Sequence, residues 1–257
     1  MARGSHEAVV WGRPYAQELV TELASSRFDL VLVNDVSALP IAFELFQGRC
    51  PVILDAHEYA PDEIPSVGLS SALLQRHNRW LCETYLPLVA ASMTVSEPIA
   101  RKYSQVFGIQ TPIVIPNAAP YSNLRPTPVS SEEIELIYHG IPGAARGIQV
   151  VIDAMQQVPK TFHLTLMLMA TARELQTLKS KVKIGTNVTF IDPVVTESIS
   201  RKVNEYDVGI YALQPLTFNE RSALPNKFFE NIQARVAQIV TPTSQMSRLV
   251  ADHDLGL

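Results

Sequence analysis

Residues 138–147, with the sequence YHGIPGAARG, have the composition of an anion-binding loop. A short apolar stretch precedes them, and a periodic segment typical of a helix follows Gly147. Gly140 and Gly147 allow the backbone to approach a ligand closely, the start of the helix offers unpaired N–H groups, and Arg146 adds a guanidinium group. The loop lacks both the GxxxxGK[ST] and the GxGxxG pattern. The alternative interpretation is an ordinary strand-to-helix turn with an exposed arginine.

Residues 224–230, with the sequence LPNKFFE, place a lysine and a glutamate near the start of a predicted helix. Lys227 and Glu230 are three residues apart and therefore share one helical face. The lysine can pair with a phosphate, and the carboxylate can accept two hydrogen bonds from a ribose diol. The alternative is a surface ion pair, which contributes only a few tenths of a kcal/mol.

Residues 55–58, with the sequence DAHE, follow an apolar segment that is typical of a buried strand. A side chain at the carboxyl end of such a strand can point into a ligand-binding cleft. His57 could there orient or polarise a hydroxyl group. The alternative is a histidine with a purely structural role.

Several other kinds of site and partner are not supported by the sequence. The 21 Lys and Arg against 25 Asp and Glu leave no basic surplus for nucleic acid, and the acidic excess lies in residues 1–118, with 8 basic and 12 acidic side chains. The histidines lack the HxH and HExxH spacings, so no metal site is predicted. Cys50 and Cys82 are expected to be buried free thiols, and GxSxG is absent. There is no apolar run long enough for a membrane span.

The elements that must position these segments alternate between short apolar runs and longer periodic stretches, which predicts parallel sheets covered by helices. We predict strands at residues 30–34, 52–56, 93–95, 113–115, 135–138, 163–168, 188–191, 208–211 and 237–240. We predict helices at residues 37–46, 70–91, 97–107, 148–157, 172–182, 197–205, 226–233 and 245–251, with Ser96 as a cap. Residues 117–128 contain three prolines and predict an extended connection.

Two further segments are MTVSEPIA at 93–100 and IPNA at 115–118. Together with the three segments above, and in the same order along the chain, they resemble a GT-B glycosyltransferase of the large family 4 group. The resemblance covers nearly all of the chain from about residue 28, and LPNKFFE resembles the LPNKxFE signature of one subgroup. It implies an α/β fold with two Rossmann-like domains that face a cleft. The implied division is an acceptor-side domain at 1–118, a linker at 119–133 and a nucleotide-sugar-binding domain at 134–257. Both domains are expected to be incomplete, truncated at the two ends of the chain.

The resemblance also assigns roles to particular residues. His57 matches the cleft histidine that contacts the transferred sugar, and is the expected catalytic residue. Glu230 matches the second glutamate of the family's paired-glutamate motif, which holds the nucleotide ribose. The expected donor-binding residues are Gly140, Arg146, Gly147, Asn226, Lys227 and Glu230. No cofactor and no metal are expected, because the nucleotide sugar is a substrate and cationic side chains would stabilise the leaving diphosphate.

Two positions depart from the family pattern. Ser222 stands where the first glutamate of the pair would fall, unless Glu220 supplies that contact, and Ile141 replaces a basic residue after the loop glycine. These departures leave open an alternative, a non-catalytic GT-B partner or regulatory subunit of another glycosyltransferase. The length of 257 residues is also short for two complete domains, which leaves open that the chain as it stands is inactive.

The function that the resemblance implies is a metal-independent, hexosyltransferase-type transfer from a nucleotide sugar of UDP or GDP. The expected acceptor is a glycan, a lipid or a small molecule, in a process such as polysaccharide biosynthesis. The expected location is cytoplasmic, with peripheral association at the inner face of the membrane and no transmembrane segment. Nucleic acid is not an expected partner.

Overall fold

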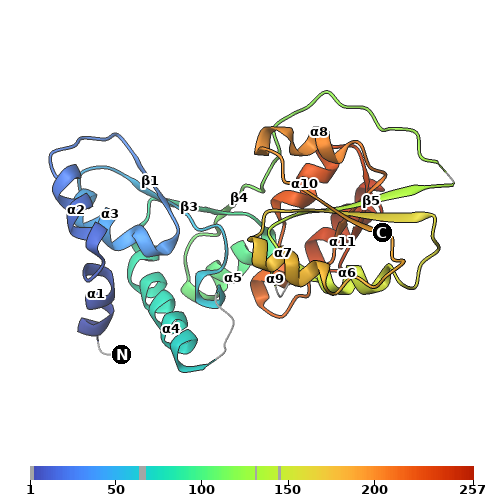
Figure 1. Ribbon diagram of the computed structural model, residues 1–257. Coiled ribbons are helices and arrows are strands. Elements are labelled where there is room, and N and C mark those ends of the chain that lie inside the picture. The colour runs from blue at the N-terminus through green and yellow to red at the C-terminus, as the bar shows by residue number, and fades with distance from the viewer. Residues whose placement is uncertain (1–2, 64–67, 131, 144–145) are drawn as a thin grey trace. The chain divides into compact units, whose positions relative to one another are not determined.

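The computed structural model describes residues 3–63, 68–130, 132–143 and 146–257 (Figure 1). The chain divides into two compact units. Unit 1 comprises Met1–Pro116 and Thr217–Ser222, and unit 2 comprises Asn117–Leu216 and Ala223–Leu257. Our sequence analysis assigned residues 217–222 to the second half of the chain, whereas the structure groups them with unit 1.

Unit 1 contains a sheet of four parallel strands in the order β1-β2-β3-β4. These strands are β1 (Val31–Asn34), β2 (Val52–Asp55), β3 (Ala91–Thr94) and β4 (Ile113–Val114). In the register, Val33 lies opposite Leu54 and Asp55 lies opposite Met93. Because all four strands run in the same direction, their carboxyl ends share one edge of the sheet, and Asp55 and His57 lie at that edge.

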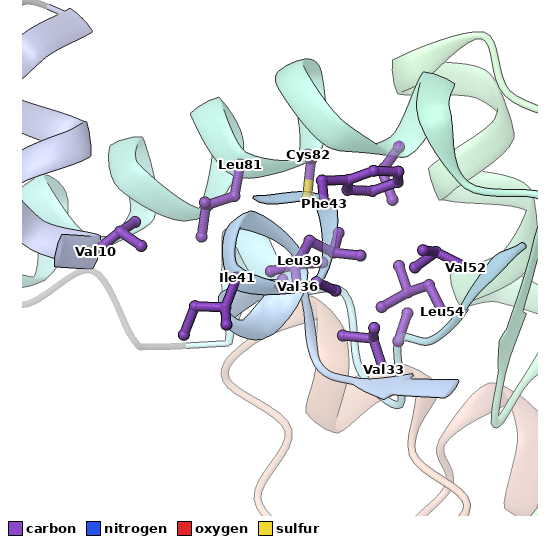
Figure 2. Packing of buried hydrophobic residues seen from close by; sticks show 14 of the residues in the cluster. Val10, Val33, Val36, Leu39, Ile41, Phe43, Val52, Leu54, Leu81 and Cys82 are labelled. Carbon is purple, nitrogen blue, oxygen red and sulfur yellow. The ribbon is translucent and has the colours of Figure 1, made fainter. Parts of the chain in front are cut away.

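The helices of unit 1 pack against this sheet through a core of aliphatic and aromatic side chains. Figure 2 shows this core, in which Val10, Phe43 and Leu81 come from three different helices. The helical segments are α1 (Arg3–Trp11), α2 (Pro14–Leu23), η1 (Val36–Ala38), α3 (Leu39–Phe46), η2 (Ala60–Asp62), α4 (Gly68–Tyr85), η3 (Leu86–Leu88), α5 (Glu97–Phe107) and α9 (Phe218–Ser222).

Helix α9 belongs to unit 1 although it is distant in sequence. The Asn219 side chain accepts a hydrogen bond from the backbone N–H of Tyr59 at 2.8 Å and donates one to the backbone carbonyl of Tyr59 at 3.0 Å. Phe218 packs edge-on against the Tyr59 ring, and the Lys102 ammonium lies 3.7 Å from the centre of the Phe218 ring. These contacts satisfy buried backbone groups of Tyr59, which explains why a short polar segment is held there.

Unit 2 contains a sheet of five parallel strands in the order β7-β6-β5-β8-β9. Its strands are β5 (Ile134–Gly140), β6 (Phe162–Leu168), β7 (Val188–Ile191), β8 (Val208–Tyr211) and β9 (Ala237–Val240). Its helical segments are α6 (Ile148–Ala154), α7 (Ala172–Lys179), η5 (Thr196–Ser198), α8 (Ile199–Val203), α10 (Asn226–Gln233) and α11 (Ser244–His253).

The central strand β5 contributes to the core on both faces of the sheet of unit 2. Leu136 and Tyr138 pack with side chains of α6, whereas Ile137 packs with Val203 of α8 and with Ala234 and Val236, which follow α10. Successive side chains of a strand point to opposite faces, so His139 lies on the α10 side, as its contacts confirm. The near-continuous apolar run of β5 follows from this burial on both sides.

The predicted strands are all present, and those at 188–191, 208–211 and 237–240 have the predicted bounds. The predicted helix at 70–91 was too long, because α4 ends at Tyr85 and β3 begins at Ala91. Pro87 lies between them in the short 3-10 helix η3 and lacks the N–H group that a continuing α-helix would need. Helices α1, α2 and α9 were not predicted.

Two smaller expectations also need correction. Ser96 occupies the N-cap position of α5 with extended backbone, but its side chain makes no capping hydrogen bond. Cys82 is buried, whereas Cys50 is only partly buried; both are free thiols. Among the described helices, none has the length and the apolar composition that crossing a membrane requires.

Candidate functional site

In unit 1, His57 is held at the carboxyl edge of the sheet by Asp55. The His57 Nε2 atom lies 3.1 Å from Asp55 Oδ2, and the backbone N–H of His57 donates to Asp55 Oδ1 at 3.4 Å. Thr94 of β3 donates a hydrogen bond to the His57 carbonyl at 2.6 Å. The imidazole is 53% exposed and therefore open to a ligand. A carboxylate that orients an exposed imidazole is an arrangement suited to polarising or deprotonating a hydroxyl group.

The backbone of His57 is in the left-handed region, with φ of 47°. Such a conformation costs a residue with a side chain about 1–2 kcal/mol. The contacts of Asp55 and Thr94 with His57 compensate for that cost. Unfavourable backbone held in place by neighbouring side chains is a feature of functional sites, which favours the functional interpretation of His57 over a purely structural one.

In unit 2, Gly140 and Gly147 both have positive φ, of 109° and 65°. A side-chain carbon at Gly140 would lie 2.3 Å from Lys227 Cε, and one at Gly147 would lie 1.8 Å from the Ala212 carbonyl oxygen. At Gly147 the clash is with backbone, so close packing and positive φ both require glycine. At Gly140 the clash is with the movable end of the Lys227 side chain, so the positive φ is what favours glycine there. Ala144 and Ala145, between them, lie outside the described residues.

The side chain of Lys227 packs within unit 2 and is largely shielded from solvent. Its Cε and Nζ atoms lie against Gly140 at the end of β5, and its Nζ atom is 5.7 Å from the centre of the Tyr211 ring. Burial and, to a smaller extent, the nearby Arg146 lower the pKa of Lys227 to about 8, and Glu230 opposes both effects. The structure thus holds two cationic side chains close together, a costly arrangement that a bound anion would relieve.

Arg146 is fixed by the hydroxyl group of Tyr211. Its Nη1 atom donates to Tyr211 Oη at 2.5 Å, so the guanidinium is partly buried rather than freely exposed. Tyr211 ends β8, the strand beside β5, and the sequence analysis did not single it out. The tyrosine was recognisable only as the last apolar residue of a strand. Its role in orienting Arg146 depends on the strand order, which local sequence does not reveal.

Glu230 lies on α10 with a side chain that is 16% exposed. Burial raises its pKa, and Lys227 opposes the increase. Among the described residues, no ion pair joins Lys227 to Glu230, so the alternative of a surface ion pair does not describe this structure. Asn226, the first residue of α10, is exposed.

A buried histidine contacts the Glu230 carboxylate. His139 Nδ1 lies 3.6 Å from Glu230 Oε2, and His139 Nε2 lies 3.0 Å from Asn231 Oδ1. Burial lowers the pKa of His139 to about 4, opposed by the hydrogen bond to Asn231, so the ring is neutral at pH 7. The sequence analysis considered His139 only as a metal ligand, and the one available signal was its position directly before Gly140.

Ser222 and Glu220, the two positions considered for the first glutamate of the pair that the resemblance implies, both belong to unit 1. Ser222 is buried in the α9 segment of unit 1. Glu220, the possible substitute, accepts a hydrogen bond from the backbone N–H of Thr217 at 2.7 Å, and its own N–H donates to Thr217 Oγ1 at 3.2 Å. This reciprocal pair is a capping box, so Glu220 has a structural role at the start of α9.

A cavity of about 390 Å³ lies beside the glycine loop of unit 2. Its lining residues come from the loop, the start of α6, α7 and the chain after β8: Pro142, Gly143, Gly147, Ile148, Gln149, Val150, Arg173, Glu174, Thr177, Leu178, Lys181 and Gln214. The cavity is adjacent to the loop but does not include Lys227 or Glu230. A second cavity of about 380 Å³, in unit 1, lies around the start of β3, away from His57.

Comparisons with solved structures show what the fold resembles. Sucrose-phosphate synthase from Thermosynechococcus elongatus superimposes with a TM-score of 0.74 at 15% identity, over 98% of this chain and 65% of that protein. Anabaena Alr3699/HepE in complex with UDP-glucose gives 0.68 at 16%, over 94% and 67%. WaaG, a glycosyltransferase involved in lipopolysaccharide biosynthesis, gives 0.61 at 14%, over 95% and 66%.

These structures establish the fold class. The protein has an α/β fold with two parallel sheets, and its structural neighbours are GT-B glycosyltransferases, as the sequence resemblance implied. The chain spans 65% of the length of the sucrose-phosphate synthase chain and 44% of that of S. aureus TarM. No protein-family model and no curated protein matches the sequence.

Proposed function

We propose that the protein is a glycosyltransferase that uses a nucleotide-sugar donor, and that unit 2 binds the nucleotide. The proposal depends chiefly on one observation: Arg146, Lys227 and Glu230 gather near the carboxyl end of β5, in a protein with the GT-B fold. Ligands of parallel α/β sheets bind at that end of the strands. HepE, which shares the fold, was solved with UDP-glucose.

The chemistry of a sugar transfer suits these side chains. The bond between the anomeric carbon and the diphosphate oxygen breaks, the acceptor oxygen bonds to that carbon, and the proton of the acceptor hydroxyl passes to the departing diphosphate or to solvent. Negative charge grows on the departing diphosphate, where Arg146 and Lys227 would stabilise it. Glu230 would accept hydrogen bonds from the ribose diol. We therefore propose a reaction that needs no metal and no further cofactor, with Asn226, Gly140 and Gly147 completing the donor site.

His57 is the proposed catalytic residue of unit 1. Asp55 and the strained backbone hold its imidazole in one orientation. This arrangement supports a contact with the transferred sugar or with the acceptor hydroxyl group. Exchange of His57 for alanine should lower turnover while leaving the affinity for the nucleotide within about twofold, because its proposed contact is with the reacting sugar.

We further propose that the sugar is a hexose and that the acceptor is a glycan, a lipid or a small molecule. WaaG acts in lipopolysaccharide biosynthesis, whose product carries both sugar and lipid. A cytoplasmic location with peripheral contact to the inner face of the membrane follows from an acceptor of that kind. A soluble acceptor would make the membrane contact unnecessary.

A nucleotide titration tests the proposed function. UDP, GDP and ADP are titrated into the wild-type protein by calorimetry, and into a Glu230→Ala variant. We expect one of the three to bind, and the variant to bind it about 5- to 100-fold more weakly, which corresponds to about 1–3 kcal/mol. Absence of binding by all three at millimolar concentration would contradict the proposal.

The placement of Ser222 and Glu220 supports a second candidate function, that of a non-catalytic GT-B partner of another glycosyltransferase. Ser222 has no carboxylate, and the Glu220 carboxylate accepts a hydrogen bond from the backbone N–H of Thr217. A product assay with nucleotide sugars and a panel of glycan and lipid acceptors separates the two. Turnover that is lost in His57→Ala supports the enzyme, whereas nucleotide binding without any turnover supports the partner.

A further inference from the structure

A chain of buried polar side chains extends behind Glu230 in unit 2. It runs from His139 on β5 to Asn231 on α10 and Gln238 on β9, which are 2%, 1% and 1% exposed. Asn231 Nδ2 donates to Gln238 Oε1 at 3.4 Å, and Asn231 Oδ1 lies 3.0 Å from His139 Nε2. Polar groups this deeply buried are costly unless they are hydrogen-bonded, so this series of three polar side chains is unfavourable unless it has a role.

The backbone of β8 makes room for this chain. A side-chain carbon at Gly209 would lie 2.4 Å from Asn231 Nδ2, so the Asn231 amide occupies the space that a side chain at Gly209 would need. The amide is therefore held against the strand in one position. A glycine in the middle of a buried strand is unfavourable in itself, and accommodation of Asn231 accounts for it.

The direction of these hydrogen bonds fixes the tautomer of His139. Because Asn231 donates through Nδ2 to Gln238, its Oδ1 atom faces His139 and can only accept. With the two amides in these orientations, the His139 Nε2 atom carries the hydrogen and Nδ1 presents its lone pair, since burial keeps the ring neutral. Among the described residues, Gln238 Nε2 has no hydrogen-bond partner in this arrangement. Glu230 Oε2 lies 3.6 Å from His139 Nδ1, slightly beyond hydrogen-bond distance.

Two acceptors that face each other repel unless one of them brings a proton. An ionised Glu230 would therefore have no partner at His139 and would be available to hydroxyl donors on its other side. A protonated Glu230 would instead donate to Nδ1. The charged group that acts on Glu230 is Lys227, on the same helix, and Arg146 in turn acts on Lys227. Burial, the larger effect, already raises the pKa of Glu230.

We propose that His139 is a positioning residue for Glu230: it holds a proton between its Nδ1 atom and Glu230 Oε2 in the free site, and a nucleoside diol displaces that proton. This inference rests on the proposed function for its ligand. The diol hydroxyl groups then donate to the ionised carboxylate, and the displaced proton passes to solvent. Nucleotide-sugar binding should accordingly release a proton and weaken as the pH falls.

The first experiment needs no ligand and examines the tautomer. In protein labelled with ¹⁵N-histidine, the ring nitrogens of His139 are assigned by comparison with His139→Gln. We expect the neutral ring with Nε2–H and a bare Nδ1 between pH 5.5 and 8. A ring that is protonated at Nδ1, or that titrates near its ordinary pKa of about 6.5, would overturn the inference. This result is independent of the proposed glycosyltransferase function.

The second experiment measures the pH dependence of UDP-glucose binding by calorimetry between pH 5.5 and 8, in buffers of different ionisation enthalpy. UDP-glucose is preferred to UDP because both ends of its diphosphate are esterified, which removes the phosphate titration near pH 6. For the wild type we expect proton release and a loss of affinity that approaches tenfold per pH unit below the pKa of Glu230.

Variants then assign that pH dependence to His139. Between pH 8 and 5.5, the loss of affinity in His139→Phe should be roughly fivefold smaller than in the wild type. The reason is that a protonated Glu230 would have no acceptor at position 139, so its protonation would be less favourable. His139→Leu serves in the same way if the phenylalanine does not fit, and Glu230→Gln should bind without pH dependence between pH 5.5 and 7, below the range in which Lys227 titrates. Equal pH profiles in the wild type and in a folded His139 variant would overturn the inference. If the wild type binds no nucleotide sugar, the proposed function fails, while the tautomer experiment still decides the role of His139.

Discussion

The candidate residues of unit 1 and unit 2 are held in place in different ways. In unit 1, His57 is 53% exposed, and its orienting carboxylate, Asp55, is only two residues away in the chain. In unit 2, Lys227 and Glu230 are largely buried, and their neighbours on β5, Gly140 and His139, are about 90 residues distant in sequence. The first site is set by local backbone conformation, the second by the packing of a helix on a sheet.

This difference has an electrostatic consequence. The exposed imidazole of His57 keeps its contact with water, whereas burial shifts the pKa values of Lys227, Glu230 and His139. A buried group that titrates near neutral pH responds strongly to the arrival of an opposite charge. The affinity of unit 2 for its ligand should therefore depend on pH, whereas the contribution of unit 1 should be seen in turnover.

The largest expected effect is at Gly147, where packing in unit 2 is tightest. Gly147→Ala should lower the free energy of unfolding by roughly 3 kcal/mol or more, because its new carbon would meet the Ala212 carbonyl and the backbone has positive φ. Gly185→Ala is the matched control: its φ is 81° and nothing lies within 4 Å, so we expect a cost of only about 1 kcal/mol. Urea denaturation measures both. Equal losses would show that close packing at Gly147 is unimportant.

The next largest effect is at Lys227, where one substitution should weaken ligand binding and increase stability. Lys227→Met should weaken binding of the nucleoside diphosphate by about 2 kcal/mol, roughly thirtyfold, through loss of a charged partner. The same change should raise the free energy of unfolding by about 1 kcal/mol, since a buried cation beside Arg146 is removed. Lys183→Met, on the exposed surface, should do neither. A Lys227 variant that binds normally would remove this lysine from the donor site.

Lys227 also predicts how nucleotide binding changes at alkaline pH. Its pKa of about 8 in the free protein means that the ammonium loses its proton as the pH rises through 8, so affinity should fall above that pH. Stability should change in the opposite sense. The unfolded chain retains the proton up to about pH 10.4, so the contribution of Lys227 to the free energy of unfolding increases between these values. Titrations at pH 7 and 9 with the wild type and Lys227→Met test this.

A smaller effect is expected from the backbone of His57. His57→Gly and His57→Ala remove the same imidazole, but only glycine adopts φ of 47° without strain. The glycine variant should therefore be more stable than the alanine variant by about 1 kcal/mol, and both should lack turnover. Denaturation curves for the pair give the difference directly. An alanine variant as stable as the glycine variant would indicate that the strain at this position is negligible.

The smallest effect concerns a buried histidine of unit 1 that is remote from Asp55 and His57 in sequence. His77 is 2% exposed and stacks on Trp80, with His6 Nδ1 at 3.2 Å from its own Nδ1. Burial lowers the pKa of His77, so the unfolded chain takes up protons first as the pH falls through 6.5, and the unfolding free energy declines there. His77→Phe should reduce that slope, and the exposed His253→Asn should not.

Much of the fold could be predicted from the sequence, because short apolar strands alternate with amphipathic helices. The strand at 188–191 and the helix at 226–233 have the predicted bounds. Helix α9 could not be predicted, because it has only five residues and four of them, Asn219–Ser222, are polar. It is held by Asn219 binding to the backbone of Tyr59, a contact 160 residues apart in the chain. A local pattern does not contain that information.

The candidate site was predictable only in its positions. The sequence places Arg146, Lys227 and Glu230 at element ends where a ligand could bind. It does not reveal that the Lys227 side chain lies against Gly140, or that the Tyr211 hydroxyl group accepts a hydrogen bond from Arg146. Both contacts depend on β8 lying beside β5. The shifted pKa values of Lys227, Glu230 and His139 follow from the same packing, so they could not be predicted from the sequence either.

The central claim, that Glu230 of unit 2 holds the ribose of a nucleotide, is tested most directly by a thermodynamic cycle. UDP and 2′,3′-dideoxy-UDP, or the GDP or ADP equivalents if one of those binds instead, are titrated into the wild type and into Glu230→Ala. We predict that removal of the diol and removal of the carboxylate are not additive, with a coupling of about 1–3 kcal/mol. Losses that simply add, with no coupling, would show that Glu230 does not contact the ribose and would contradict the account.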